Sequence, residues 1–392
     1  MKSICLIVTA EVTALSFLKG FVRFLTDQGW SVTVIAASSG GLEHWASSEG
    51  GCAMSLDLER DPHLGSDYRA LLRLFWLLRA MKPSIVVSAT PKAGLLGMLA
   101  ATGARVPVRV YELWGLRLET EHGLKRMLLM CLEWLAMACA SQVWANSNSL
   151  AAAAVAMRLL PKRKIRVLGK GSSHGVDCEH FSRAQPVEPP ASVVDFVGRS
   201  DGALIIGFIG RITRDKGLDT LLNAVRRCNE HGLTVRLLVV GDDEDPALFQ
   251  RVSHECREGN VYLSPFVEDV RGYLSVMDVL CLPTLREGFP NVVLEAACME
   301  IPSIVSNATG AIDSVVDGET GWVFQTGDVR GLASRIAWVA ANRDAVRAVG
   351  CAARVYAVGA FSREMVWRDK ESNWARLIRS VRDVQRRVTR SE

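Results

Sequence analysis

Two kinds of hydrophobic pattern alternate along the first half of the chain. Short runs of consecutive apolar residues, typical of strands buried in parallel sheets, occur at residues 4–8, 32–36, 85–87, 108–111, 142–145 and 164–168. Stretches with the apolar spacing of an amphipathic helix separate them, at residues 14–28, 68–81, 95–102, 124–140 and 149–160. Strands that alternate with helices in this way predict an α/β domain with a doubly wound parallel sheet.

The same alternation restarts after a proline-rich, weakly periodic segment at residues 184–202, and we expect a linker over residues 171–202. The expected strands beyond it are residues 203–209, 235–240, 261–263, 279–282, 303–305 and 322–324. The expected helices are residues 218–230, 247–258, 270–276, 291–299 and 329–341. The predicted fold class is α/β, with two Rossmann-like doubly wound domains, residues 1–170 and 203–365, facing a cleft. A C-terminal helix over residues 366–392 is expected to pack back onto the first domain.

Composition agrees with a soluble globular protein of two or three domains, since the 392 residues are 49% hydrophobic and 22% charged. The 10 cysteines show no metal-ligand spacing and several lie in apolar runs, which favours reduced thiols in the cytoplasm. The first apolar run is too short for a signal peptide. The most apolar helical stretch, residues 127–140, is shorter than the roughly 20 residues of a membrane span and contains Glu133, so no transmembrane segment is expected.

Positive charge is concentrated at the C-terminal end, where residues 366–392 hold eight Arg or Lys and four Asp or Glu. On a helical wheel one side carries Arg376, Arg379, Arg382, Arg386 and Arg390, and the opposite side carries Leu377, Ile378, Val381, Val384 and Val388. Either this helix packs on a domain with its basic face in water, or the basic face attracts anionic lipid headgroups. The basic, apolar segment 69–79 leaves the same two alternatives. We expect no nucleic-acid partner, because the chain has no recognition motif or aromatic platform.

Residues 286–295 place two carboxylates, Glu287 and Glu295, around a Gly-Phe-Pro-Asn turn. Pro290 suits the start of a helix, so we expect a helix to begin near Asn291. The amides of its first turn would then favour an anion. Carboxylates that bind hydroxyls beside a helix end that binds phosphate make a receptor for a nucleotide sugar, with one carboxylate on the sugar and the other on the ribose.

A second segment, residues 206–218, ends an expected strand at Gly210 and then presents Arg211 and Lys216 before a helix. Cations at this place can neutralise a diphosphate. The glycine in residues 239–243 allows either a close backbone approach to a ligand or a simple tight turn. Residues 264–269 are expected to line a base pocket, with Val267 as a stacking edge, and residues 309–313 to border the sugar pocket.

Together these residues resemble the family 4 glycosyltransferases of the GT-B fold. The chain is most similar to the bacterial branch that builds capsule, O-antigen and exopolysaccharide repeat units. The motifs that carry the resemblance span nearly the whole chain and lie at residues 90–98, 115–120, 169–177, 210–217, 287–295 and 317–324.

The resemblance implies a retaining transfer from a nucleoside-diphosphate sugar, such as a UDP-sugar, without a metal or other cofactor. The donor would bind the second domain through the residues Val267, Arg211, Lys216, Glu287, Phe289, Asn291, Val292 and Glu295. Arg211, Lys216 and Glu287 are the expected catalytic residues: the two cations contact the diphosphate and Glu287 holds the transferred sugar. Glu295 would hold the ribose. The implied acceptor is a saccharide on a polyprenyl diphosphate, so the protein would be cytoplasmic and peripheral on the inner face of the cytoplasmic membrane.

The chain departs from the family pattern in two places, the turn at residues 9–13, which lacks the glycine pair of many relatives, and Trp114. Trp114 stands where many members have a histidine near the reacting sugar, and a tryptophan cannot take a proton. Glu112, Glu119 and His122 are nearby candidates for polar contacts, whereas His174 is expected to be structural or at the rim of the cleft. The replacement at Trp114 leaves a non-catalytic partner of a polysaccharide assembly complex open as an alternative. A sugar-nucleotide epimerase of similar fold is a further alternative.

Overall fold

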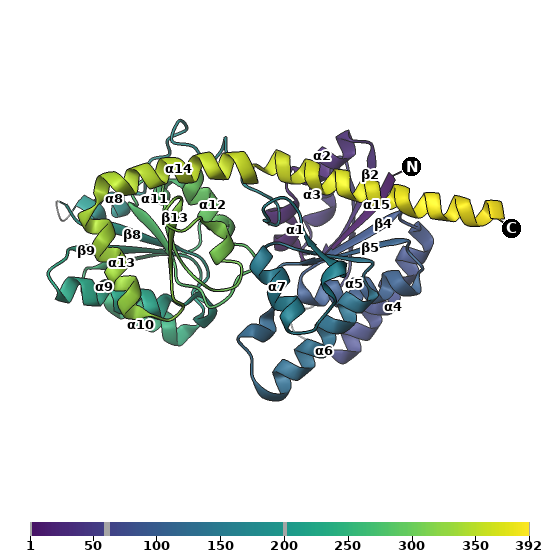
Figure 1. Cartoon of the computed structure of the whole chain (residues 1–392), viewed down its shortest axis with the longest axis horizontal. Helices are drawn as coiled ribbons and strands as arrows, with labels where there is room; N and C mark the ends of the chain where they lie inside the picture. Colours follow the sequence, from purple (N-terminus) through teal and green to yellow (C-terminus); the bar gives the residue numbers. More distant parts are fainter. Residues whose placement is uncertain (1, 59–62, 199–201, 392) are drawn as a thin grey trace. The chain divides into compact units, whose positions relative to one another are not determined.

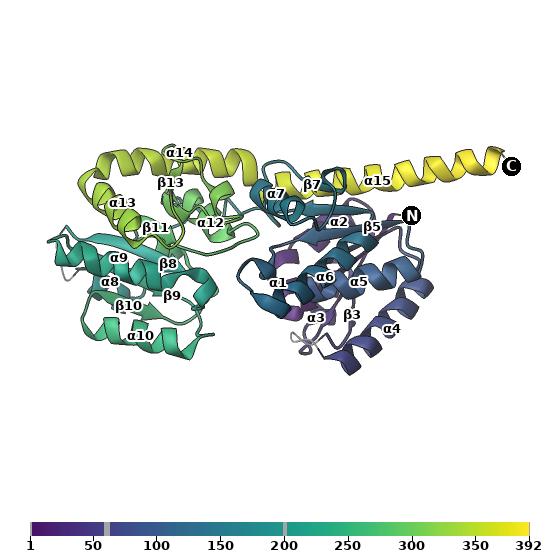
Figure 2. The ribbon, with the colours of Figure 1, turned by 60° about the horizontal axis from the view of Figure 1, so that its bottom comes forward.

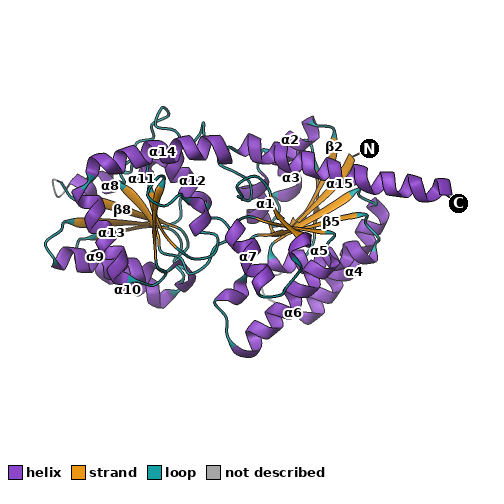
Figure 3. Cartoon of the chain, viewed as in Figure 1, coloured by secondary structure: helices purple, strands orange, loops and turns teal. Residues whose placement is uncertain are grey.

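The chain folds into two compact units in the computed structural model, which describes residues 2–58, 63–198 and 202–391, with side chains except at residues 64 and 384–391. The first unit comprises Met1–His174 and Glu364–Glu392, and the second comprises Gly175–Arg363. Each unit has a central sheet with helices around it (Figures 1 and 3). The predicted fold class, two parallel-sheet α/β domains of Rossmann type, is confirmed.

A seven-stranded sheet in the order β3-β2-β1-β4-β5-β6-β7 forms the centre of the first unit as described. Its strands are all parallel and comprise β1 (Lys2–Ala10), β2 (Trp30–Ala37), β3 (Cys52–Ser55), β4 (Ile85–Ala89), β5 (Val108–Leu113), β6 (Gln142–Ala145) and β7 (Ile165–Val167). Its helices include α1 (Glu11–Leu18), α2 (Phe21–Asp27), α3 (Leu42–Ser48), α4 (Leu64–Met81), α5 (Pro91–Gly103), α6 (Gly123–Cys139) and α7 (Asn148–Ala156).

Helices cover both faces of this sheet. Helices α4, α5 and α6 lie side by side over one face (Figure 2), and their inner residues, such as Leu74 and Met137, share one core. The C-terminal helix α15 (Arg363–Ser391) belongs to the layer on the other face, where Trp374 is fully buried and stacks on Trp144 with ring centroids 5.8 Å apart. The prediction that the C-terminal helix returns to the first domain is therefore confirmed.

The basic face of α15 is described only in part. Ile378 is buried and Leu377 and Val381 pack on the core of the first unit, while Arg376, Arg379 and Arg382 are exposed. The other expected members of the two sides lie beyond the described side chains, namely Val384, Arg386, Val388 and Arg390. As far as it is described, α15 is a packed helix with a solvated basic side.

The second unit contains a six-stranded parallel sheet in the order β10-β9-β8-β11-β12-β13. The strands are β8 (Leu204–Ile209), β9 (Val235–Val240), β10 (Val261–Ser264), β11 (Val279–Leu282), β12 (Ser303–Ser306) and β13 (Gly321–Phe324). The helices include α8 (Ala191–Gly198), α9 (Leu218–Glu230), α10 (Pro246–Arg257), α11 (Arg271–Leu274), α12 (Asn291–Cys298), α13 (Val329–Ala341) and α14 (Arg343–Phe361). Strands β8 and β11 are neighbours, and the order of strands along the chain reverses between them. The carboxyl ends of these two strands are therefore the topological switch point of the sheet.

Several elements differ from the sequence prediction. The helix expected at residues 14–28 is broken at Gly20, whose φ of 77° is left-handed, and a Cβ there would lie 3.1 Å from the Trp367 ring. Strand β3 and helices α3 and α14 were not predicted. The expected linker 171–202 is wrong over α8, because Val193 and Phe196 are buried in the core of the second unit. An amphipathic helix of eight residues is too short to give a clear period beside so many prolines.

The two places where the chain passes between units lie next to each other. The Val176 amide donates to the Phe361 carbonyl at 2.9 Å, and the Arg363 amide donates to the Val176 carbonyl at 3.0 Å. Gly175 has a φ of 74°, and a Cβ there would lie 2.6 Å from the Cα of Arg363. The close pairing of these two segments therefore requires a glycine at position 175.

Candidate active site

The residues singled out in the second half of the sequence lie on loops that follow neighbouring strands. The loop after β8 carries Arg211 and Lys216, and the loop after β11 carries Glu287. Both loops leave the carboxyl ends of their strands at the switch point of the sheet. Open parallel α/β sheets bind ligands at this position.

Lys216 and Glu287 form an ion pair between the Lys216 Nζ and the Glu287 Oε1. Their side chains are only 19% and 14% exposed, so the pair is partly shielded from water. A second ion pair joins the adjacent residues, from the Arg286 guanidinium to the Asp215 carboxylate. The two loops are thus joined twice by opposite charges, and the Asp215–Arg286 pair is a feature that the sequence analysis missed.

Backbone contacts bring the two loops close enough for these pairs. The Leu285 amide donates to the Asp215 carbonyl at 2.8 Å, and the Thr284 hydroxyl donates to the same carbonyl at 2.9 Å. Gly217 has a φ of 67°, and a Cβ at this position would lie 2.0 Å from the Pro283 carbonyl oxygen. A side chain at position 217 would push the loops apart, so glycine is needed for the Lys216–Glu287 pair.

The second carboxylate, Glu295, lies in the second turn of α12, which begins at Asn291 as predicted. Although part of its surface reaches solvent, protein surrounds the carboxyl, and this loss of hydration raises the pKa of Glu295 to about 7. Within the described part of the chain its carboxylate forms no hydrogen bond or ion pair. Glu295 is therefore a carboxyl group without a bound partner among the described residues, and its pKa of about 7 makes its protonation change near neutral pH.

Arg211 has a different partner from Lys216. Its guanidinium donates to Glu244 at 2.7 Å, and the Arg211 side chain is 51% exposed. Glu244 lies in the loop after β9, next to β8 in the sheet. The structure thus places Arg211 at the same sheet edge as Lys216 but does not pair it with Glu287.

The other expected donor-binding residues divide into two groups. Asn291 and Val292 are partly exposed in the first turn of α12, although the Val293 amide already donates to the Pro290 carbonyl at 3.2 Å. The Phe289 ring instead points into a core cluster and contacts Phe361, with ring centroids 5.2 Å apart. Burial of a large apolar ring is more favourable than its exposure to water, which accounts for the position of Phe289 in this core.

The loop after β10 holds Val267, the expected stacking edge of a base pocket. Val267 is partly buried against the core of the second unit, whereas the neighbouring Phe266 exposes 62% of its surface. The Phe266 amide donates to Asp242 of the loop after β9 at 3.1 Å. Alternation of side chains along an extended segment turns neighbouring residues to opposite sides, so Phe266 is the more exposed apolar side chain of this loop.

Two glycines pack other site loops together. A Cβ on Gly241 would lie 2.0 Å from the Gly210 carbonyl oxygen, so this glycine allows the loops after β8 and β9 to touch each other. Gly310, with a φ of 78°, lies against the Glu287 and Gly288 backbone, and the Glu287 amide donates to the Thr309 carbonyl at 2.8 Å. The loop at residues 309–313 therefore borders the Glu287 loop, where the sugar pocket was expected.

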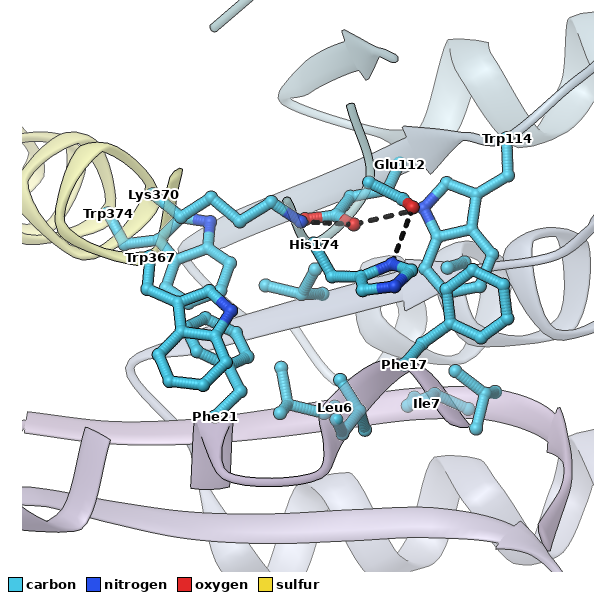
Figure 4. A pocket seen from close by; sticks show the side chains of 15 residues that line it. Leu6, Ile7, Phe17, Phe21, Glu112, Trp114, His174, Trp367, Lys370 and Trp374 are labelled. Carbon is cyan, nitrogen blue, oxygen red and sulfur yellow. Dashed lines mark hydrogen bonds and ion pairs between the residues drawn. The ribbon is translucent and has the colours of Figure 1, made fainter. Parts of the chain in front are cut away.

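In the first unit, Trp114 is part of a buried polar cluster. Its indole N–H donates to the Glu112 carboxylate at 3.1 Å, and the Lys370 ammonium of α15 donates to both Glu112 oxygens at 2.8 and 2.9 Å (Figure 4). Glu112 and Lys370 are both buried. The Trp114 ring stacks on Phe17 with centroids 4.5 Å apart, so Glu112 and Phe17 together fix its orientation.

His174 lies beside this cluster and borders the same small cavity of about 20 Å³, room for about one water molecule. Burial, with the Lys370 charge as a second cause, lowers the pKa of His174 to about 3, so the ring is neutral at neutral pH. It contacts Phe17 edge-on, and its Nδ1 is 2.8 Å from the Ser173 hydroxyl. Of the other candidates, His122 is exposed ahead of α6 and Glu119 lies in a short 3-10 turn.

Comparisons with known proteins agree with this architecture. The family described as "Glycosyl transferase 4-like domain" matches residues 16–171, and "Glycosyl transferases group 1" matches residues 203–342. The chain is 34% identical to the capsular polysaccharide biosynthesis glycosyltransferase CapM of Staphylococcus aureus, over 92% of this chain and 93% of that protein. The chain therefore belongs to the family 4 glycosyltransferases of the GT-B fold, and the resemblance seen in its motifs is confirmed.

Two further proteins are similar over most of their length. A UDP-Gal:alpha-D-GlcNAc-diphosphoundecaprenol alpha-1,3-galactosyltransferase of Escherichia coli is 25% identical over 82% of this chain and 84% of its own. The crystal structure of HepE from Anabaena in complex with UDP has a TM-score of 0.74 at 18% identity, covering 96% of this chain and all (100%) of that one. The second likeness is one of fold.

Proposed function

We propose that this glycosyltransferase moves a sugar, with retention of anomeric configuration, from a UDP-sugar to a saccharide on a polyprenyl diphosphate in the synthesis of a bacterial surface polysaccharide. The observation that carries the proposal is the Lys216–Glu287 pair at the switch point of the second unit. A cation and a hydroxyl-binding carboxylate side by side suit a ligand that joins a diphosphate to a sugar. The names of the capsular and diphosphoundecaprenol relatives support the pathway and the acceptor class.

In the proposed reaction the bond between the anomeric carbon and the diphosphate oxygen breaks, and a bond to an acceptor hydroxyl forms. Negative charge then develops on the departing diphosphate, where Lys216 and Arg211 stabilise it; such electrostatic stabilisation is usually the largest contribution of a protein to catalysis. Glu287 holds hydroxyls of the transferred sugar and Glu295 holds the ribose. Since Trp114 cannot accept a proton, the acceptor proton goes to the leaving phosphate oxygen.

We also propose that no metal takes part. Among the described residues, no group of three or more His, Cys, Asp and Glu side chains has the arrangement of a metal site. Transfer is then expected to continue in the presence of EDTA, because the cationic side chains take the place of a divalent ion. A loss of transfer that added Mg²⁺ or Mn²⁺ restores would contradict this proposal.

A lipid-linked acceptor requires contact with a membrane surface. No helix in the described ranges has the length and apolarity to cross a bilayer. We therefore propose peripheral attachment to the inner face of the cytoplasmic membrane.

The test is transfer by the purified protein from a panel of UDP-sugars to a polyprenyl-diphosphate saccharide, with Glu287→Ala as the comparison. Transfer by the wild type, lost in the variant, with the anomeric configuration of the product retained, is the expected result. UDP-sugar binding without any transfer would favour the non-catalytic partner. Conversion of the donor to an epimer without acceptor would favour the epimerase.

A further inference from the structure

Helix α6 presents an unusual row of large apolar side chains to solvent. Leu124 is 84% exposed, and Met127, Leu128 and Trp134 each expose more than half of their surface. Met127 and Leu128 lie three and four residues after Leu124, and Trp134 lies seven residues after Met127, so all four are on one side of the helix. The other side of α6 is buried through Ala136 and Met137. Large apolar side chains gathered on one exposed side of a helix are typical of an interaction site.

Helix α4 has a second row of the same kind. Tyr68, Leu72 and Trp76 are exposed at intervals of four residues, and Trp76 exposes 64% of its surface. The opposite side of α4 is buried through Ala70, Leu74 and Leu78. The segment 69–79 therefore both covers the sheet, through one side, and offers a free apolar row on the other.

Both rows belong to one layer of the first unit. Helices α4 and α6 pack on either side of α5 over the same face of the sheet (Figure 2). Because each helix buries its inner side in the common core, both exposed rows lie on the outer surface of this layer. We call this surface, formed by Tyr68, Leu72, Trp76, Leu124, Met127, Leu128 and Trp134, the α4–α6 face.

The charges around the α4–α6 face are mainly positive. Exposed Arg69, Arg73 and Arg79 run beside the apolar row of α4, and exposed Arg126 lies in the first turn of α6. The acidic groups of these two helices are already compensated or hidden: Asp67 pairs with Lys92 at 2.6 Å, and Glu133 is buried against Tyr111.

More positive charge lies past the C-terminal end of α6. Trp134 borders an open groove that is also lined by Arg158, Arg163 and Lys164. No acidic residue lines this groove among the described residues. At the N-terminal end of α6, the Glu121 carboxylate pairs with the Lys125 ammonium at 2.5 Å. The α4–α6 face therefore combines apolar rows with arginines along and beyond them.

We propose that the α4–α6 face docks on a bilayer that contains anionic phospholipid, with the apolar rows entering the headgroup boundary and the arginines contacting lipid phosphates. Exposed Trp and Tyr favour this boundary, and a folded helix with Trp and Leu on one side flanked by cations is typical of surface-bound helices. The choice of a bilayer over a protein partner rests on the proposed function, because a polyprenyl-linked acceptor lies in a membrane.

The test uses full-length protein and sedimentation with vesicles of equal amounts of phosphatidylglycerol and phosphatidylcholine at low salt. Wild type is expected to bind, and phosphatidylcholine alone to bind less. Leu124→Ser/Leu128→Ser should weaken binding about tenfold or more, since two apolar side chains no longer enter the lipid. Arg69→Gln/Arg73→Gln should weaken it about fivefold for each charge removed, and added salt should remove this difference.

Matched controls separate this face from the rest of the chain. Val355→Ser/Val358→Ser removes an exposed apolar pair from α14 of the second unit and should leave binding unchanged. Arg376→Gln/Arg379→Gln/Arg382→Gln neutralises exposed residues of α15 and should have the smaller effect. If these α15 substitutions abolish binding while the α6 pair has no effect, the basic helix is the attachment site and the proposal is wrong.

The unmodified protein offers a second readout. Cys131 is exposed within the α6 row, and Cys351 is exposed on α14 of the second unit. Vesicles should protect Cys131, but not Cys351, from a charged alkylating reagent that does not enter lipid, as measured by mass spectrometry. Equal alkylation of Cys131 with and without bound vesicles would overturn the proposal.

Two other outcomes are informative. A wild-type dimer that Leu124→Ser/Leu128→Ser converts to a monomer, without vesicle binding, would assign the face to a second copy of this chain and overturn the proposal. UDP binding, followed by thermal shift, is independent of vesicles. A protein that docks on vesicles but neither binds UDP nor transfers sugar would contradict the proposed function and leave the docking face standing.

Discussion

Replacing Glu287 by alanine should have opposite effects on the binding of UDP and on sugar transfer. UDP lacks the transferred sugar that Glu287 would hold, and in the free protein this carboxylate is paired with Lys216. The carboxylate also carries the same sign of charge as the diphosphate. Removing it frees Lys216 for the nucleotide, whereas the transferred sugar loses its hydrogen-bond acceptor.

The magnitude follows from the partial burial of the pair. Exposed ion pairs contribute about 0.2–1 kcal/mol, and breaking a fully buried one costs about 3–5 kcal/mol. Side chains that are 19% and 14% exposed lie between these limits, at about 1–2 kcal/mol. We therefore expect Glu287→Ala to lower the free energy of unfolding by about that amount, and to tighten UDP binding by up to about tenfold.

Lys216→Ala provides the contrast. It removes a charged hydrogen-bond donor from the diphosphate, worth about 1.5–3 kcal/mol, so UDP binding should weaken by about 10- to 100-fold. Transfer should fall in both variants, by about 100-fold or more for Glu287→Ala if it loses contacts that strengthen in the transition state. Glu287→Gln keeps an acceptor oxygen and should retain more transfer than Glu287→Ala.

The measurements are UDP titration calorimetry, denaturant unfolding and transfer rates at saturating donor for the two single variants and the double variant. The double-variant cycle gives the coupling between the two side chains directly. If Glu287→Ala weakens UDP binding as much as Lys216→Ala does, the pair serves only to hold two loops together. Unchanged transfer by Glu287→Ala would remove Glu287 from the site.

Three further predictions concern single residues. The pKa of Glu295 is raised to about 7, so ionising its carboxyl destabilises the folded protein; this destabilisation is absent below about pH 4.5 and reaches its full size above pH 7. Glu295→Gln should therefore stabilise the protein increasingly as pH rises through this window, by at most about 3 kcal/mol. A difference in urea unfolding that does not change with pH would contradict this. The pKa of His174 is lowered to about 3, so at falling pH the unfolded chain takes up a proton before the folded one, and the free energy of unfolding should fall below about pH 6.5. In thermal melts, His174→Gln should reduce this loss of stability at acid pH, whereas His122→Gln, at an exposed histidine, should not. Gly217→Ala should lower the free energy of unfolding by more than about 2 kcal/mol and weaken UDP binding, because the new Cβ would meet the Pro283 carbonyl. Gly232 has a φ of 83° and open space around it, so Gly232→Ala should lower the free energy of unfolding by about 1–2 kcal/mol and leave UDP binding unchanged.

Much of the secondary structure was predictable because it depends on local pattern. The apolar runs of β6, β9 and β11 and the amphipathic period of α9 and α13 gave the observed bounds. Prediction failed where the local signal was weak or where a distant residue decided the outcome. Gly20 breaks a continuous helical pattern, and its left-handed backbone packs under Trp367, which is far away in the sequence.

The candidate site was predictable to the level of loops but not of side-chain directions. The motifs placed Lys216 and Glu287 at strand ends, and the structure brings them into contact. Nothing local indicated that Phe289 turns into the core, that Phe266 is more exposed than Val267, or that Arg286 pairs with Asp215. Each of these depends on which surfaces meet after folding.

The amino-acid sequence by itself determined the α/β class, the repeated unit of strand and helix, and the loops at which charged residues gather, because these follow from periods of a few residues. Only the tertiary structure decided the partners. Lys370 neutralises the buried Glu112 across 258 residues of chain, and Lys216 meets Glu287 because β8 and β11 are neighbours in the sheet. Strand order and the burial of a charge depend on long-range packing, which no local pattern of hydrophobic and polar residues records.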